Sequence, residues 1–243
     1  MSEAALWGLV AGSSLVLGAL VAVTLRPSKG VIGMIMAFGS GVLISAVAYE
    51  LVDEAFAAAG NSGRVAGGVA TGALAFYLGD LYIDSRGGAD RKRSDGQQAG
   101  GSSRAIVLGT VLDGIPEGMV IGISLIDGGG VSVAVIAAVF LSNLPESIAA
   151  TTGLERTGMS RAARFRMWTV IALAVAVSSM IGFGILDDAS HETIALVEGF
   201  AAGALLVMLA DTMMPEAYER AHKAAGLFTV LGFALAFALS TLD

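Results

Sequence analysis

Long apolar stretches alternate with short polar or glycine-rich breaks along the whole chain. A helix of about 20 mostly apolar residues is long enough to cross the hydrocarbon core of a bilayer. We therefore predict membrane-spanning helices at residues 4–25, 31–53, 64–84, 104–126, 130–153, 163–186, 191–215 and 223–242. The pattern predicts an all-α integral membrane protein with eight transmembrane helices, numbered here as spans one to eight.

One break is much longer than the others. It runs from Ser85 to Ser103, carries Arg91-Lys92-Arg93, and is otherwise rich in Gly, Ser and Gln. This composition is typical of disorder, so we predict that residues 85–103 form a disordered cytoplasmic loop. Residues 1–243 are interpreted as a single transmembrane domain. The first residues lack the basic region of a signal peptide, so we expect the first apolar stretch to be retained as a helix.

The basic residues predict the orientation of the spans. All of the 14 Lys and Arg residues except Arg64 fall in breaks, or at the span ends that adjoin these breaks, on one side of the membrane if there are eight spans. Cytoplasmic loops carry an excess of Lys and Arg, so both termini are predicted to face outward. Seven or nine spans would place some basic clusters on the wrong side. We predict a multi-pass protein of the cell (inner) membrane.

Composition agrees with a lipid environment. The chain is 55% hydrophobic and 14% charged, whereas soluble domains carry about 25% charged residues. This much apolar surface requires the lipid bilayer as a partner. The chain has no cysteine, which excludes disulfides and thiolate metal sites. Its net charge of −7 does not favour binding to nucleic acid.

Spans two and seven repeat part of each other's sequence. One constant offset superposes identical residue types, namely Phe38 on Phe200, Gly41 on Gly203, Ala48 on Ala210, Glu54 on Glu216 and Ala55 on Ala217. Because these spans cross the membrane in opposite directions, the match predicts an inverted repeat. The predicted layout is a 3+2+3 inverted-repeat arrangement, with the symmetry axis passing through spans four and five.

The central pair carries two similar motifs, Leu112-Asp-Gly-Ile-Pro-Glu-Gly118 and Leu141-Ser-Asn-Leu-Pro-Glu-Ser147. Each proline lacks an N–H, so the carbonyl one turn earlier loses its helical partner. Each glutamate follows in the middle of an apolar span, where a carboxylate is costly. A structural kink with a protonated glutamate is the alternative interpretation. The duplication at matching positions favours a functional site.

The spacing predicts how these side chains are presented. Asp113 and Glu117 are four residues apart and share one helical face, and Ser142 and Glu146 do the same on the partner helix. Together with the Asn143 amide, they would form an oxygen-rich site at mid-membrane. Carboxylates this close repel one another at low dielectric, and a divalent cation or shared protons would relieve the repulsion. Such a site suits Mg, Ca, Mn, Fe(II) or Zn.

At these residues the chain resembles the ZIP (Zrt/Irt-like) family of divalent metal transporters, in its prokaryotic type. The family's span-four motif is His-Asn-x-Pro-Glu-Gly, and span five carries His/Gln-Asn/Asp-x-Pro-Glu. The stretches Gly199-Phe-Ala-Ala-Gly-Ala204 and Met214-Pro-Glu-Ala217 of span seven are also similar to the family. The resemblance covers essentially the whole chain and implies eight spans, both termini outside and the 3+2+3 arrangement.

The departures from the family pattern concern the imidazoles. Asp113 stands where the family has His in span four, and Ser142 stands where it has His or Gln in span five. Some members bind a second metal through a span-six carboxylate, whereas this chain offers only Ser178 and Ser179 there. The resemblance therefore implies one main, all-oxygen metal site, with the ligands Asp113, Glu117 and Glu146, and with Asn143 and Ser142 as further ligands.

The expected function is uptake of a divalent metal as substrate, with zinc first and manganese, iron, cobalt or cadmium as alternatives. A second interpretation keeps the fold but makes protons or another small ion the substrate. An intramembrane enzyme is disfavoured, because the Gly-x-Gly-Asp pattern is missing and neither histidine lies in the central spans. A retinal-binding pump is excluded because no lysine lies in the interior of a predicted span.

Acidic residues outside the central pair are candidates for the ion pathway. Glu50 and Asp53 lie toward the outer end of span two, and Asp80, Asp211 and Glu216 lie toward the inner side. Asp211 is the strongest of these candidates, because it lies well inside an apolar run. Glycines such as Gly67-Gly68, Gly72 and Gly182-x-Gly184 would serve close helix contacts within the chain or in a homodimer.

Overall fold

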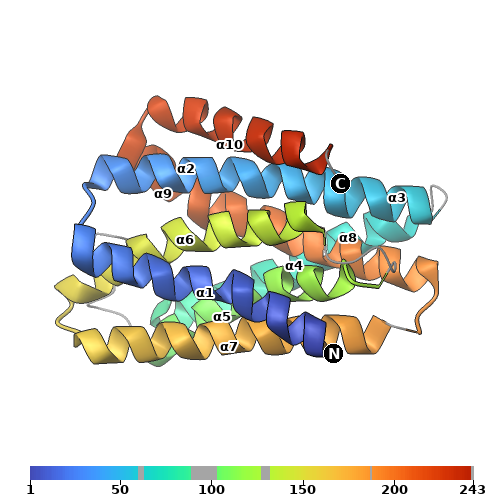
Figure 1. The fold of residues 1–243 in the computed structure, drawn as a ribbon, viewed down its shortest axis with the longest axis horizontal. Helices are drawn as coiled ribbons and strands as arrows, with labels where there is room; N and C mark the ends of the chain where they lie inside the picture. Colours follow the sequence, from blue (N-terminus) through green and yellow to red (C-terminus); the bar gives the residue numbers. More distant parts are fainter. Residues whose placement is uncertain (60–62, 89–102, 127–131, 187, 242–243) are drawn as a thin grey trace.

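A computed structural model describes residues 1–59, 63–88, 103–126, 132–186 and 188–241, and within these ranges it contains helices and no strand (Figure 1). The elements are α1 (Ser2–Leu25), α2 (Lys29–Ala46), η1 (Val47–Asp53), α3 (Glu54–Ala58), α4 (Gly63–Ile83), η2 (Asp84–Gly88), α5 (Ser103–Ile123), α6 (Val133–Arg156), α7 (Arg161–Leu186), α8 (His191–Met208), η4 (Leu209–Met213), α9 (Met214–Ala221) and α10 (Ala224–Ser240). The elements η1 and η4 are π-helical turns that continue the α-helices beside them, whereas η2 contains a kink at Gly87.

These elements give one continuous helix for each predicted span, and the prediction of an all-α membrane protein is confirmed. Six of the described helices are long and apolar enough to cross a bilayer, judged by length and composition alone. The shorter apolar helix α10 and the helix α5, which carries two buried carboxylates, lie outside that set. The count of eight crossings therefore stays a prediction.

Some helix ends differ from the predicted spans. The second helix continues to Ala58 and the seventh to Ala221, each past a π-helical turn. The element η2 follows the third helix to Gly88, where the sequence predicted the start of the loop, and the chain kinks there because Gly87 has a positive φ of 93°. The second and seventh helices extend beyond their predicted ends because their final turns are still satisfied by backbone hydrogen bonds. The remainder of the predicted loop, residues 89–102, lies outside the described residues.

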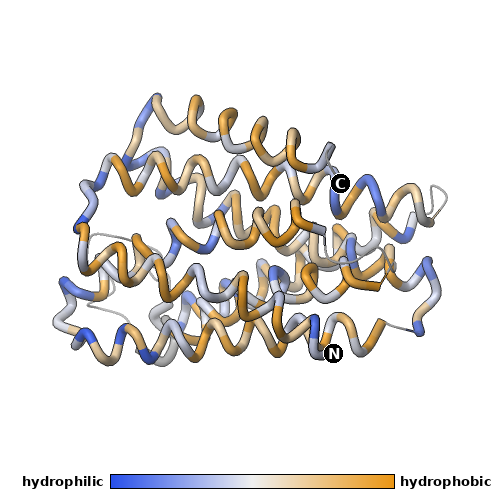
Figure 2. Tube along the Cα trace, in the orientation of Figure 1, coloured by the Kyte–Doolittle hydropathy of each residue, from blue (hydrophilic) through white to orange (hydrophobic). Residues whose placement is uncertain are grey.

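Hydrophilic residues gather toward the two ends of the bundle, whereas the middle of most helices is hydrophobic (Figure 2). Large apolar side chains are exposed along the middle, including Leu74 of α4, Val177 of α7 and Leu231 of α10. Helix α1 begins and α10 ends toward the same end of the bundle (Figure 1). This agrees with termini on one side of the membrane, and the outward orientation of that side stays a prediction.

Close glycine contacts show the inverted repeat in three dimensions. A Cβ on Gly41 of α2 would overlap the Thr229 carbonyl oxygen of α10, and one on Gly232 would overlap that of Phe38. The other half has the same pair of contacts between α4 and α8. Gly203 lies against the Val69 carbonyl and Gly72 against the Phe200 carbonyl, in the positions that the repeat assigns. The two helix pairs are therefore equivalent packings.

The π-helical turns follow the same symmetry. Both η1 and η4 begin where the sequence match between spans two and seven places equivalent residues, Val47 and Leu209. A π-helical turn adds one residue to the helix and is commonly found at functional sites. In both halves, a short α-helix continues beyond the turn. The backbone conformation thus supports the equivalence of the second and seventh helices that the sequence match predicted.

The helices form two groups. One group contains α1, α5, α6 and α7, in which α1 packs on α6 and α7, and α5 packs on α7. The other contains the pairs α2 with α10 and α4 with α8. Contacts of α2 with α6 and of α5 with α8 join the groups. Gly68, Gly72 and Gly182 all serve contacts within the chain, and the homodimer stays a prediction.

Candidate metal site

The polar residues predicted as metal ligands are buried in the centre of the bundle. Their residues are exposed by no more than 2%, and they are Asp113 and Glu117 on α5 and Ser142, Asn143 and Glu146 on α6. Buried carboxylates and amides require polar partners, because desolvation of an unsatisfied polar group costs several kcal/mol. Five such residues on two neighbouring helices therefore mark a polar centre within an otherwise apolar core.

One contact joins the two helices at this centre. The Ser142 hydroxyl oxygen lies 3.4 Å from Oε1 of Glu117, in a geometry that allows the hydroxyl to donate a hydrogen bond to the carboxylate. The same hydroxyl lies 3.1 Å from the Val139 carbonyl oxygen of its own helix. The structure therefore brings the two Pro-Glu motifs face to face through a residue from each.

The two prolines lie inside α5 and α6 without ending either helix. The Leu141 carbonyl, which Pro145 leaves without its helical donor, faces the backbone of α2. A Cβ on Gly39 would come within 2.9 Å of that oxygen, so glycine allows the two helices to meet there. On α5, the Ser178 hydroxyl of α7 donates to the Ile115 carbonyl at 2.7 Å. At each proline-containing helix, a neighbouring helix therefore packs against, or donates to, a backbone carbonyl near the proline.

The three carboxylates are not gathered into one cluster. Among the described residues, no group of three or more His, Cys, Asp and Glu side chains lies close enough to hold a metal ion. Asp113, Glu117 and Glu146 each take part in further polar interactions. The Asn143 amide nitrogen is buried without a hydrogen-bond partner. Coordination of one ion by all the predicted ligands stays a prediction.

Helix α7 presents small hydroxyl side chains to α5. Ser178 and Ser179 are buried, and the Ser179 hydroxyl has no hydrogen-bond partner. A Cβ on Gly118 would approach the Ser178 side chain to 2.7 Å, and Gly122 lies against the Ser179 carbonyl. This close packing places serines rather than a carboxylate beside the helix that carries Glu117.

The predicted outer pathway residues differ in burial. Glu50 lies in η1, is exposed by 8%, and accepts a hydrogen bond from the Ser132 hydroxyl at 2.9 Å. Ser132 is also the N-cap of α6 and accepts from the Val135 N–H. Asp53 at the end of η1 is exposed. Glu50 therefore connects the N-terminal end of α6 to the second helix, whereas Asp53 faces the surroundings.

The predicted inner pathway residues also differ in burial. Asp80 of α4 and Glu216 of α9 are buried, and Glu216 accepts a hydrogen bond from Nε of Arg220 at 3.0 Å. Asp211 in η4 is exposed and lines an open groove with Ala73 and Tyr77 of α4. Position within an apolar run therefore did not predict burial for Asp211.

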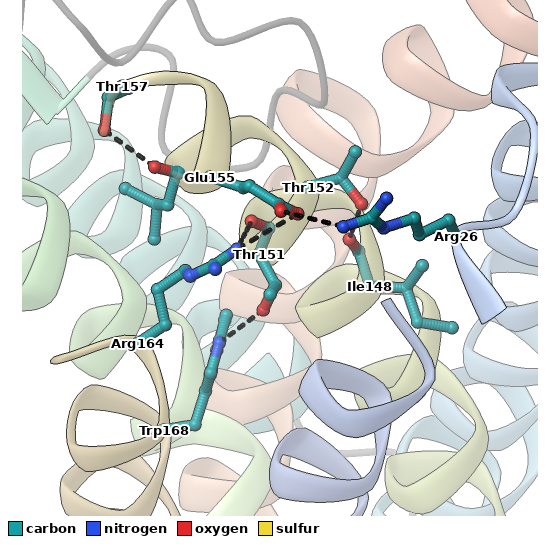
Figure 3. Close-up of polar contacts among 9 residues, drawn as sticks. Arg26, Ile148, Thr151, Thr152, Glu155, Thr157, Arg164 and Trp168 are labelled. Carbon is teal, nitrogen blue, oxygen red and sulfur yellow. Dashed lines mark hydrogen bonds and ion pairs between the residues drawn. The ribbon is translucent and has the colours of Figure 1, made fainter. Parts of the chain in front are cut away.

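A buried polar network at the basic end of the bundle was missed by the sequence reasoning (Figure 3). Arg164, predicted only as a loop charge, has a side chain exposed by 6% and forms an ion pair with Glu155 at 3.2 Å. It also donates to the Thr151 carbonyl at 3.3 Å, and Trp168 donates to the Thr151 hydroxyl at 2.7 Å. Arg26 lies 3.8 Å from Glu155. The C-terminal end of α6 is thereby held against the ends of α1 and α7.

Glu198 of α8 was also passed over, although it is exposed by only 5%. Its burial could have been predicted from the feature that also marked Asp211, a carboxylate inside an apolar run. For Arg164, no such signal exists, because an arginine one turn into a helix is equally compatible with a solvated surface.

We expect Thr151→Val to destabilise the protein by about 1–3 kcal/mol, because the buried Trp168 N–H would lose its acceptor. Valine keeps the shape of threonine, so packing is preserved. Thr152→Val is the matched control, since the Thr152 hydroxyl donates only within its own helix, to the Ile148 carbonyl. Thermal unfolding in detergent compares the two. Equal stability of both variants would show that the Trp168 hydrogen bond contributes nothing.

The fold and its centre define a multi-pass helical membrane protein with a buried site of carboxylate, amide and hydroxyl groups. Residues 84–240 match the family model described as ZIP zinc transporter. The chain belongs to the ZIP family, whose members are membrane transporters rather than enzymes. It is also similar to a protein of Arabidopsis thaliana that is named as a zinc transporter, with 25% identity over 192 residues. This similarity covers 78% of the chain but only 30% of the length of the Arabidopsis protein.

Proposed function

We propose that this protein carries a divalent metal cation into the cell through the polar centre of α5 and α6. The observation that carries the proposal is the contact of Ser142 with Glu117 within a set of five buried polar residues on two proline-containing helices. Ionisable groups at mid-membrane are expensive and usually functional. Family membership supports transport as the use of this site.

We propose zinc as the first substrate, with manganese, iron, cobalt and cadmium as alternatives. The name of the Arabidopsis relative favours zinc. The donor atoms favour harder metals, because they are oxygens and both histidines are exposed at helix ends, away from the polar centre. Asp113, Glu117 and Glu146 would supply the charge, and Asn143 and Ser142 would complete the coordination.

We propose that transport moves α5, α6 and their neighbours against the second and seventh helices. A small cavity of about 170 Å³ supports this, because it lies between α5 and the helices α4 and α8. Its lining is apolar and includes Phe76, Met119 and Phe200. Displacement along an apolar, incompletely filled boundary would break few hydrogen bonds. The basic end of the bundle would face the cytoplasm of the cell (inner) membrane, which makes the direction uptake.

Competitive uptake into proteoliposomes tests the proposal. Purified protein in liposomes should accumulate zinc faster than protein-free liposomes, and the competing metals should reduce the zinc rate according to their own affinities. A pH-sensitive dye inside the same liposomes tests the alternative substrate. Proton flux without any accumulation of these metals would overturn the proposal in favour of a proton or small-ion transporter.

A further inference from the structure

A groove on the outside of the bundle is lined by none of the five predicted metal ligands. It has a volume of about 280 Å³ and is open to the surroundings. Its lining comes from the first turns of α5 and α7 and from the segment between α6 and α7, namely Val107, Met159, Ala163, Arg166, Met167 and Val170. Five of these six residues are apolar, and methionine side chains adapt readily to an occupant.

The groove follows one face of α7. Ala163, Arg166, Met167 and Val170 are spaced at i, i+3, i+4 and i+7, which places them along one helical stripe. Val170 is exposed by 51%, and Leu108, beside the groove on α5, is exposed by 61%. An apolar stripe of this kind, in a membrane protein, is covered by hydrocarbon. Its occupant therefore has an apolar chain.

Arg166 interrupts this stripe with a positive charge. It is exposed, and among the described residues no carboxylate pairs with it and no aromatic ring stacks on it. Its neighbours along α7 are engaged, since Arg164 is buried against Glu155 and Arg161 lies over the Phe165 ring at 5.7 Å. The guanidinium of Arg166 is thus available to an external anion.

The position of the groove along the bundle identifies the kind of anion. Arg166 lies in the second turn of α7, at the end of the bundle that carries nearly all the basic residues. Basic pockets between transmembrane helices on the cytoplasmic side bind the head groups of anionic lipids. An occupant with both an apolar chain and a phosphate at this depth is a phospholipid of the surrounding leaflet. A free anion would leave the apolar stripe uncovered.

We propose that this groove binds an anionic phospholipid, with the head-group phosphate on Arg166 and an acyl chain along Ala163, Met167 and Val170. The guanidinium would donate two hydrogen bonds to phosphate oxygens, as arginine commonly does. The lipid would then lie between the inner ends of α5 and α7. It would stabilise the packing of the helix that carries Asp113 and Glu117, without touching either residue.

The test is the binding of phosphatidylglycerol and phosphatidylcholine to the full chain in detergent, measured by native mass spectrometry and by thermal unfolding. We expect wild type to bind phosphatidylglycerol more tightly, and Arg166→Gln to weaken that binding by about fivefold. Arg161→Gln is the matched control and should change it less than twofold. Arg166→Lys should retain most of the binding, and Val170→Phe, which fills the groove, should weaken binding of both lipids.

Several outcomes would overturn the proposal. Equal losses in Arg166→Gln and Arg161→Gln would indicate general attraction to surface charge. Equal affinity of wild type for the two lipids would exclude recognition of the phosphate charge. Stabilisation by inorganic phosphate at the same concentration would assign Arg166 to a free anion. Thermal unfolding of each variant without added lipid shows that it is folded, so that a loss of binding is read only from folded protein.

Discussion

Glu146→Gln and Glu117→Gln are each expected to abolish metal uptake into proteoliposomes. Both glutamates are buried at the centre of the bundle, and Glu117 already lies beside Ser142 of the other helix. Glutamine keeps the size of the side chain but removes the negative charge that would offset a divalent cation. The loss should exceed the roughly 10- to 100-fold effect of removing an outer-shell partner of a metal ligand. Initial rates of zinc uptake measure it.

A matched control separates the site from general effects of charge. Glu3→Gln removes one carboxylate from the exposed first turn of α1, and its uptake should equal that of wild type. Thermal unfolding should show that all three variants are folded. Because each buried glutamate has polar partners within the protein, the neutral variants are expected to remain stable. Uptake at the wild-type rate in both glutamate variants would refute the proposed site.

Gly72→Val is expected to prevent folding of the protein in the membrane. A Cβ at this position would overlap the Phe200 carbonyl of α8, and neither helix backbone can move without disrupting the rest of the pair. Overpacking usually costs about 1–3 kcal/mol when side chains can adjust, and more is expected where backbone is the obstacle. Gly67→Val on the same helix is the control, because no atom of a neighbouring element lies within 4 Å of its Cβ position. Yield of monodisperse protein on size exclusion compares them.

The inverted repeat extends this prediction to the other half. Gly232 of α10 lies against the Phe38 carbonyl as Gly72 lies against that of Phe200. Gly232→Val should therefore reduce the yield of folded protein as much as Gly72→Val. Gly226→Val on the same helix should be tolerated, because a Cβ at Gly226 would point into open space. A folded, monodisperse Gly232→Val variant would show that the two packings are not equivalent.

The sequence predicted the helices well because each one needs a long apolar run to cross a bilayer. It predicted the repeat because Phe38, Gly41 and their counterparts keep the same spacing in both halves. The helix ends were less predictable. Residues 216–221 continue their helix through mostly polar sequence, since backbone hydrogen bonding does not require apolar side chains, and residues 54–58 continue theirs past the acidic pair Asp53-Glu54.

The candidate site could be predicted only in part. Burial of the five proposed ligands followed from their place inside apolar spans, and the contact of Ser142 with Glu117 followed from pairing α5 with α6. The rotation of each helix about its own axis could not be predicted from the sequence, because it depends on packing against several neighbouring helices. This is why Asp211 faces outward although Glu198, on the same long helix, is buried.

The matched π-helical turns would lie toward opposite surfaces of the membrane. Both η1 and η4 follow the main α-helical part of their helix, so in the predicted orientation η1 would lie in the outer part of the second helix and η4 in the inner part of the seventh. A π-helical turn replaces the i→i−4 hydrogen bonds of the α-helix by i→i−5 bonds over a few residues. A single local sequence solution, used twice, would therefore place a matched interruption of the α-helical hydrogen bonding toward each face of the bilayer.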